Sequence, residues 1–122
     1  MKKLILAATA TLGIFTLAAT AEATVLRVVV VQATDSAAYM NDLAKIRATL
    51  TRLGSKSTMR VWRTRFAGPD AGAIVVSIEY PDMATFAAED AKVQADAEYT
   101  SLVKGLDRVR KIVSDSLYEE MK

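Results

Sequence analysis

The side chains of this chain that could do chemistry are aromatic, basic and acidic, because it contains neither histidine nor cysteine. Without these two types the usual zinc, copper and haem-iron ligands are missing. Nucleophilic catalysis by a Ser-His-Asp or Cys-His arrangement is also excluded. We therefore expect no metal site and no cofactor. Acid–base work would fall to carboxylates, lysine, arginine, tyrosine, serine and threonine.

Trp62 is the only tryptophan, and it lies among three arginines, Arg60, Arg63 and Arg65. One interpretation is a ligand pocket with an aromatic wall and a guanidinium that holds an anionic or phenolic group. The other is a core or dimer-interface tryptophan flanked by solvated arginines. Tyr39 also has two interpretations, since it belongs to an apolar helical stripe and could serve the core or the pocket.

Strand alternation decides which of these side chains can meet. The even-numbered residues of 74–80 are apolar enough to lie under helices. We expect the even-numbered residues of 58–66 to share their face, although a register change of one residue would reverse this. The candidate pocket between sheet and helices would then be lined by Trp62, Tyr80 and Phe86, with Arg60 at its edge and Tyr39 on the facing helix. Arg63, Arg65, Ser77 and Glu79 would point to the opposite face.

The first residues follow the order of a secretory signal. Two lysines precede an uncharged apolar stretch from Leu4 to Ala19, and Ala21-Glu22-Ala23 supplies small residues where a signal peptidase acts. The stretch has about 16 residues, fewer than the ~20 of a spanning helix. We predict a signal peptide at 1–23, cleaved after Ala23, and a periplasmic or secreted product without membrane contact. Cleavage after Ala21 and a retained anchor are the alternatives.

Residues 24–122 have the size of one domain. The chain has 16 basic and 14 acidic residues, a net charge of +2, and the leader holds two of the basic and one of the acidic ones. This near balance of charges argues against a nucleic-acid partner, because proteins that bind nucleic acids carry basic residues clustered on one face. Without disulfides, an exported domain of this size must be stabilised by packing or by burying surface against a second copy.

The remaining sequence predicts alternating strands and helices. Apolar residues from Tyr39 to Leu53 recur every three or four positions, and Gly54 ends this helix. A second helical segment begins after Asp82 and changes its apolar phase near Ala95, so we expect one kinked helix or two short ones. Residues 25–32, 58–66, 73–80 and 110–118 are β-branched or alternating and predict four strands.

The order βαββαβ predicts a ferredoxin-like α+β sandwich, a four-stranded antiparallel sheet with two helices on one face. The valines of 28–31 cannot all point at the helices, so the other face is also apolar. An uncovered apolar face is an interaction surface. Its simplest partner is a second copy, and we predict a homodimer formed sheet to sheet.

Three motifs accompany this order: G-P-D-x-G at residues 68–72, I-E-Y-P-D-M-A-T-F-A at 78–87 and D-A-K-V-Q-A-D-A-E-Y at 90–99. With them the segment Val25–Glu119 resembles the dimeric α/β-barrel superfamily, near its antibiotic-biosynthesis-monooxygenase and NIPSNAP-type groups. The resemblance implies the fold and the dimer. It implies no single activity, because the superfamily includes oxygenases, isomerases and haem proteins. Haem-handling members use a histidine ligand, which this chain lacks.

Two functions follow as expectations. The first is an exported homodimer that binds a small hydrophobic or aromatic molecule. The alternative is a cofactor-independent monooxygenase or isomerase acting on an aromatic or phenolic substrate, since such oxygenases hold and deprotonate a phenolic substrate in an aromatic, polar pocket. This chain departs from that pattern because it has no histidine and its only asparagine is Asn41.

Overall fold

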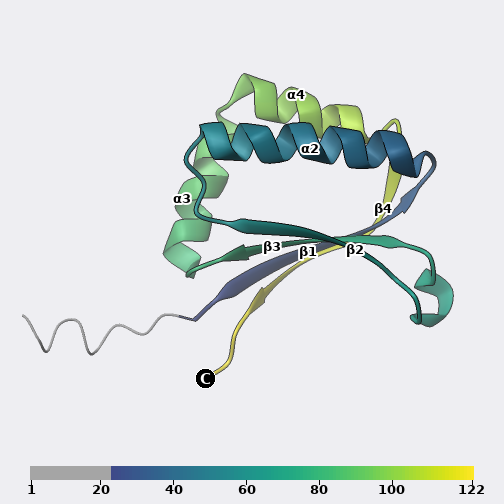
Figure 1. Ribbon diagram of the computed structural model, residues 1–122. Helices are drawn as coiled ribbons and strands as arrows, with labels where there is room; N and C mark the ends of the chain where they lie inside the picture. Colours follow the sequence, from purple (N-terminus) through teal and green to yellow (C-terminus); the bar gives the residue numbers. More distant parts are fainter. Residues whose placement is uncertain (1–22) are drawn as a thin grey trace, which may run out of the picture.

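The computed structural model describes residues 23–122 (Figure 1). The predicted leader lies outside these residues except for Ala23, so cleavage and export stay predictions. Within residues 23–122 no helix is both long and apolar enough to cross a membrane. The elements in chain order are β1 (Val25–Ala33), α2 (Ser36–Arg52), β2 (Thr58–Arg63), a 3-10 turn (Gly68–Asp70), β3 (Ile74–Tyr80), α3 (Met83–Gln94), α4 (Ala97–Leu106) and β4 (Arg110–Glu119).

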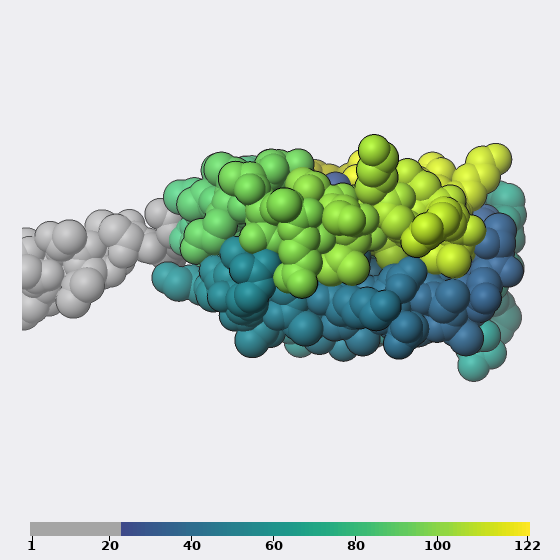
Figure 2. All heavy atoms as spheres, turned by 90° about the horizontal axis from the view of Figure 1, so that it is seen from above, coloured from purple at the N-terminus to yellow at the C-terminus, as the bar shows by residue number. Residues whose placement is uncertain are grey.

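The four strands form one antiparallel sheet in the order β2-β3-β1-β4. Helices α2 and α4 lie across one face, and α3 descends at one end of the sheet (Figure 1). Seen from above, the segments of α2 in blue and α4 in green run side by side over the strands (Figure 2). This arrangement confirms the predicted ferredoxin-like fold, in which two crossover connections place their helices on the same face of the sheet.

Helix α2 forms as its apolar spacing predicts. Asp35 caps its start, because the carboxylate accepts a hydrogen bond of 3.0 Å from the Ala38 backbone N–H. Gly54 follows its end with φ +74°, a conformation that glycine adopts without strain. The buried residues Tyr39, Leu43, Ile46 and Leu50 belong to the hydrophobic core, and buried Thr49 faces α4, where its hydroxyl lies 3.2 Å from a carboxylate oxygen of Glu98.

The second helical segment divides in two, as its change of apolar phase indicates. Ala95 and Asp96 separate α3 from α4, and the Asp96 carboxylate accepts a 2.9 Å hydrogen bond from the Tyr99 backbone N–H. Arg52 of α2 holds the same carboxylate at 2.9 Å and Glu98 at 3.0 Å. The hydrogen bonds from Tyr99 and Arg52 keep the pKa of Asp96 below its usual value. Asp96 therefore caps the start of α4 and, through its ion pair with Arg52, also links α4 to α2.

The register expected between the second and third strands is wrong. Trp62 pairs with Val75 and Arg60 with Ser77, so both point to the uncovered face with the odd-numbered residues of β3. The residues that point at the helices are Met59 and Val61, which pack against the core. A slip of one residue reverses every side chain. Burying the apolar side chains of Met59 and Val61 against the core stabilises the sheet more than burying an arginine and a tryptophan would, because the arginine would lose its contact with water.

The second strand is also shorter than expected, since it ends at Arg63 and not at Phe66. Thr64 closes the connection to β3 by donating to the Ala73 carbonyl at 2.9 Å and accepting from the Gly72 N–H at 3.1 Å. The 3-10 turn lies inside this closed loop. Phe66 is fully exposed, and the predicted position for Arg65 on a strand face does not apply because the strand has ended.

The opposite face of the sheet carries no helix among the residues described (Figure 1). Its middle is apolar because Leu26, Val28 and Val30 alternate with the core valines of β1. Trp62 and Tyr118 add aromatic side chains to this face, and the two residues are 52% and 56% exposed. We call this surface the open face. It is made by Leu26, Val28 and Val30 of β1, Val75 of β3, Trp62 of β2 and Tyr118 of β4.

Candidate functional site

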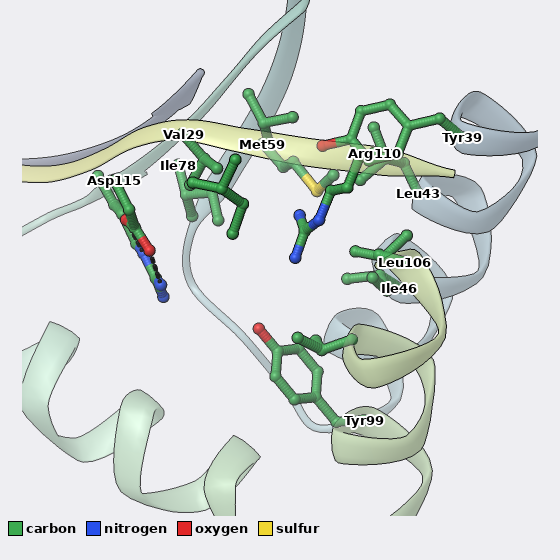
Figure 3. Close-up of a pocket in the computed structure, with 14 residues that line it drawn as sticks. Val29, Tyr39, Leu43, Ile46, Met59, Ile78, Tyr99, Leu106, Arg110 and Asp115 are labelled. Atoms are coloured by element: carbon green, nitrogen blue, oxygen red, sulfur yellow. Dashed lines mark hydrogen bonds and ion pairs between the residues drawn. The ribbon is translucent and has the colours of Figure 1, made fainter. Parts of the chain in front are cut away.

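A cavity of about 70 Å³ lies between the sheet and the helices α2 and α4 (Figure 3). Its wall is mainly apolar and includes Val29, Leu43, Ile46, Met59, Val76 and Leu106. Its polar lining consists of two tyrosines, two arginines and one aspartate, which are Tyr39, Tyr99, Arg27, Arg110 and Asp115. An apolar chamber with a few polar groups is the usual form of a small-molecule site.

Strand β4 reaches the cavity through a β-bulge. Val30 pairs with Ser114, but Val31 pairs with Ile112, which leaves Val113 as an extra residue in β4. Regular alternation would place residues an odd number apart, such as Arg110 and Asp115, on opposite faces of the sheet. The extra residue brings both to the helix side, where they line the cavity.

Arg110 and Tyr39 form the inner polar end of the cavity. The Arg110 side chain is only 9% exposed, and its guanidinium carbon lies 5.9 Å from the centre of the Tyr39 ring. Among the described residues, neither Arg110 Nε nor the fully buried Tyr39 hydroxyl has a hydrogen-bond partner. The nearest carboxylate is that of Asp107, whose Oδ1 lies 3.8 Å from Nε. This distance is too long for a hydrogen bond.

Arg27 and Asp115 form the other polar end. Arg27 Nε donates to Asp115 Oδ1 at 3.0 Å, and Nη2 donates to Oδ2 at 2.7 Å. These hydrogen bonds lower the pKa of Asp115 and raise the pKa of Arg27. Both side chains are about one-third exposed, so the pair stands where the cavity meets solvent. The pair is neutral as a whole, because it joins one charge of each sign.

Tyr99 projects from α4 toward the space between these two ends, with its hydroxyl directed inward (Figure 3). Burial raises the pKa of its phenol, while Arg27 and Arg110 act in the opposite direction. The hydroxyl is therefore protonated at neutral pH. It can serve as a hydrogen-bond donor or acceptor toward a molecule in the cavity.

The five residues predicted for the pocket lie in three places. Only Tyr39 lines the cavity. Tyr80 lies on the helix side of the sheet and packs against Phe86 of α3, with ring centres 5.1 Å apart and an angle of 80° between planes. Burial raises the pKa of Tyr80 to about 12. Trp62 and Arg60 lie on the open face, where Trp62 Nε1 donates to Ser77 Oγ at 2.8 Å.

The cavity's charged and phenolic residues other than Tyr39 were missed: Arg27, Tyr99, Arg110 and Asp115. Arg27 offered a signal, because it interrupts a run of apolar residues in β1. The sequence does not predict which face of the sheet carries Arg110, because the β-bulge breaks the alternation of side chains along β4. Within residues 23–122 no group of three or more potential metal ligands among histidine, cysteine and carboxylates comes together.

Comparison with known proteins gives a match of fold. No family model and no curated protein matches the chain. SnoaB, a cofactor-independent oxygenase from Streptomyces nogalater, superposes with a TM-score of 0.62 at 14% identity, over 82% of this chain and 95% of that one. A conserved protein of unknown function from Bacteroides thetaiotaomicron, described as a possible oxidoreductase, gives 0.59 at 10% identity, over 82% and 100%. The predicted resemblance is thus confirmed at the level of the fold.

Proposed function

We propose that this chain, which shares the fold of a cofactor-independent oxygenase, binds a small hydrophobic or aromatic molecule in the cavity between its sheet and helices. The observation that carries the proposal is the lining: an apolar wall with a buried arginine and a buried tyrosine at one end. Such a chamber removes the apolar part of a ligand from water and leaves polar groups to orient it.

The size of the cavity limits the ligand. A cavity of roughly 150 Å³ is known to hold benzene, and this one has about 70 Å³. A single ring would therefore extend from the inner end toward Arg27 and Asp115, where the lining becomes partly exposed. We expect a ligand with one ring or a short aliphatic chain, not a large polycyclic molecule.

We propose further that the protein acts as a homodimer joined through the open face. Leu26, Val28 and Val30 form an apolar band there, and Trp62 and Tyr118 flank it. Exposed aromatic and aliphatic side chains together are typical of an interface. A stable dimer of this kind would bury on the order of 2,000 Å². The cavity lies on the other side of the sheet, so pairing would leave it accessible.

Export is part of the proposal and is supported by the leader-like start of the sequence. Two lysines, an apolar stretch and Ala21-Glu22-Ala23 follow one another in the order that secretory signals show. In the periplasm or medium a small binding protein would meet its ligand directly.

A second candidate is a cofactor-independent oxygenase or isomerase acting on an aromatic or phenolic substrate. The shared fold of SnoaB favours it, and Tyr99 with Arg110 would face a phenolic substrate in the cavity. Its weakness is that the one carboxylate among the described cavity-lining residues, that of Asp115, is occupied by Arg27. Oxygen uptake on addition of phenolic substrates to the purified protein would favour this candidate over simple binding.

The binding proposal can be tested by following amide chemical shifts while benzamide, a neutral single-ring probe, is added. Saturable shifts should be centred on the cavity-lining residues of α4 and β4. Val103→Trp, which fills the cavity from α4, should abolish them. Ser101→Trp adds the same side chain at an exposed position of α4 and should leave them unchanged. Shifts that do not saturate, or that survive Val103→Trp, would contradict the proposal.

A further inference from the structure

We infer that the ligand of this cavity carries an anionic oxygen group, a carboxylate or an ionised phenol, which Arg110 and Tyr39 bind. This inference rests on the proposed function, because it names the chemical class of the molecule that the same cavity would hold. A buried cation and a buried hydroxyl stand side by side on the wall, and each has a polar atom with no hydrogen-bond partner among the described residues.

The first step concerns the buried guanidinium. Removing a charge from water is unfavourable unless the charge is paired and hydrogen-bonded. The Arg110 side chain is nine-tenths buried, yet among the described residues the one carboxylate within 4 Å of its guanidinium is that of Asp107 at 3.8 Å, and the Asp107 side chain is 71% exposed. Water screens so exposed a partner strongly. The Asp115 carboxylate acts on Arg110 only from a longer distance and is hydrogen-bonded to Arg27. The ring of Tyr39 contributes only a weak attraction at 5.9 Å.

The second step is the charge balance of the lining. Its ionisable charges belong to Arg27, Asp115 and Arg110. Arg27 and Asp115 neutralise each other through two short hydrogen bonds. The positive charge of Arg110 is left over, so the cavity as a whole favours one negative charge on its occupant.

The third step is geometry. In Figure 3 the terminal nitrogens of Arg110 project into the cavity, the hydroxyl of Tyr99 is directed toward the same space, and the Tyr39 ring lies beside Arg110. A planar guanidinium binds a carboxylate through two parallel hydrogen bonds. The phenolic hydroxyl of Tyr39 can donate a further one. The apolar remainder of the ligand would then lie along Val29, Ile46 and Met59 toward the mouth.

The experiment compares benzoate with benzamide, two probes of nearly the same shape that differ in charge, on the mature protein by chemical-shift titration. We expect wild type to bind benzoate roughly tenfold or more tightly than benzamide, the effect of a hydrogen bond to a charged group. Arg110→Gln should remove this preference and leave benzamide binding within about twofold of wild type. Arg110→Lys should retain part of it, because it keeps the charge but not the planar fork.

Arg108→Gln is the matched control, since Arg108 is exposed and lies two residues before Arg110. It should leave both affinities unchanged. Equal binding of the two probes by wild type, or a parallel loss of both in Arg110→Gln, would overturn the inference while leaving the binding proposal intact. Failure of wild type to bind either probe would overturn both. Should Arg110→Gln not fold, Tyr39→Phe serves as the second variant, with an expected loss of a few-fold for benzoate alone.

Discussion

Tyr39→Phe is expected to raise the free energy of unfolding, because the substitution removes a buried hydroxyl that has no hydrogen-bond partner among the described residues. Tyr39 is fully buried. A buried polar group without a partner costs about 1–3 kcal/mol. Phenylalanine keeps the ring against the core and most of the contact with Arg110. We therefore expect a gain near the lower bound, about 1 kcal/mol, or a rise in Tm of about 4–8 °C for a domain of this size.

Urea unfolding measures this difference, with wild type and variant at one protein concentration because dimerisation would couple stability to concentration. Tyr80→Phe is the control. Tyr80 is also buried, at 8% exposed, but its hydroxyl is not among the buried atoms that lack a partner, so its loss should change stability by less than about 0.5 kcal/mol. Tyr39→Ala measures how much the whole ring contributes, and we expect it to lower the free energy of unfolding by about 3–5 kcal/mol.

A loss of stability of about 1 kcal/mol or more in Tyr39→Phe would refute the reasoning. It would mean that the hydroxyl is hydrogen-bonded in the folded protein. Tyr39 would then have no free donor to offer a ligand, and the anion site would depend on Arg110 alone. A gain of stability together with weaker benzoate binding would instead show that the protein keeps the hydroxyl for its ligand at the expense of its own stability.

Four further outcomes are expected. Val30→Asp, a charge on the open face, should split the dimer or unfold it; sedimentation of the wild type as a stable monomer at micromolar concentration would argue against the interface. Gly54→Ala should lower the free energy of unfolding by about 1 kcal/mol because φ is +74°, whereas Gly105→Ala inside α4 should raise it by about 0.5–1 kcal/mol in the same urea assay. The hydrogen bonds from Arg27 lower the pKa of Asp115. The stabilisation that these hydrogen bonds give is therefore complete above pH ~4 and is lost as the pH falls through the pKa of Asp115 in the folded protein. Asp115→Asn should make the stability of the protein less dependent on pH in this acid range. The intact mass of the exported protein should begin at Thr24, and a product that starts at Met1 in the membrane fraction would contradict export.

Local signals carried most of the fold prediction. The apolar spacing of α2 and the glycine after it predict that helix closely, because capping and amphipathic spacing act over one or two turns. The change of phase near Ala95 likewise marked the real boundary between α3 and α4. Such features need no knowledge of distant contacts.

The candidate site was predicted less well, because it depends on which strand faces meet. Trp62 and Arg60 drew attention by their residue types, yet the pairing of β2 with β3 turns them to the open face. That pairing follows from Met59 and Val61, whose burial decides the register. A cavity does lie between the sheet and the helices, where the sequence predicts a pocket, and Tyr39 lines it; ligand binding there stays a prediction.

The extra residue Val113 in β4 has a consequence for how sequences of this kind can diverge in length. If it were deleted, Ser114 and Ile112 would become neighbours and could keep their present partners, Val30 and Val31, in an unbroken ladder. Arg110 would still stand opposite Ala33 and still face the helices. Elsewhere in β4 the loss of one residue would reverse every side chain on one side of the deletion. Two descendants that differ by one codon here can thus inherit the same cavity, and an alignment between them should place its gap at Val113.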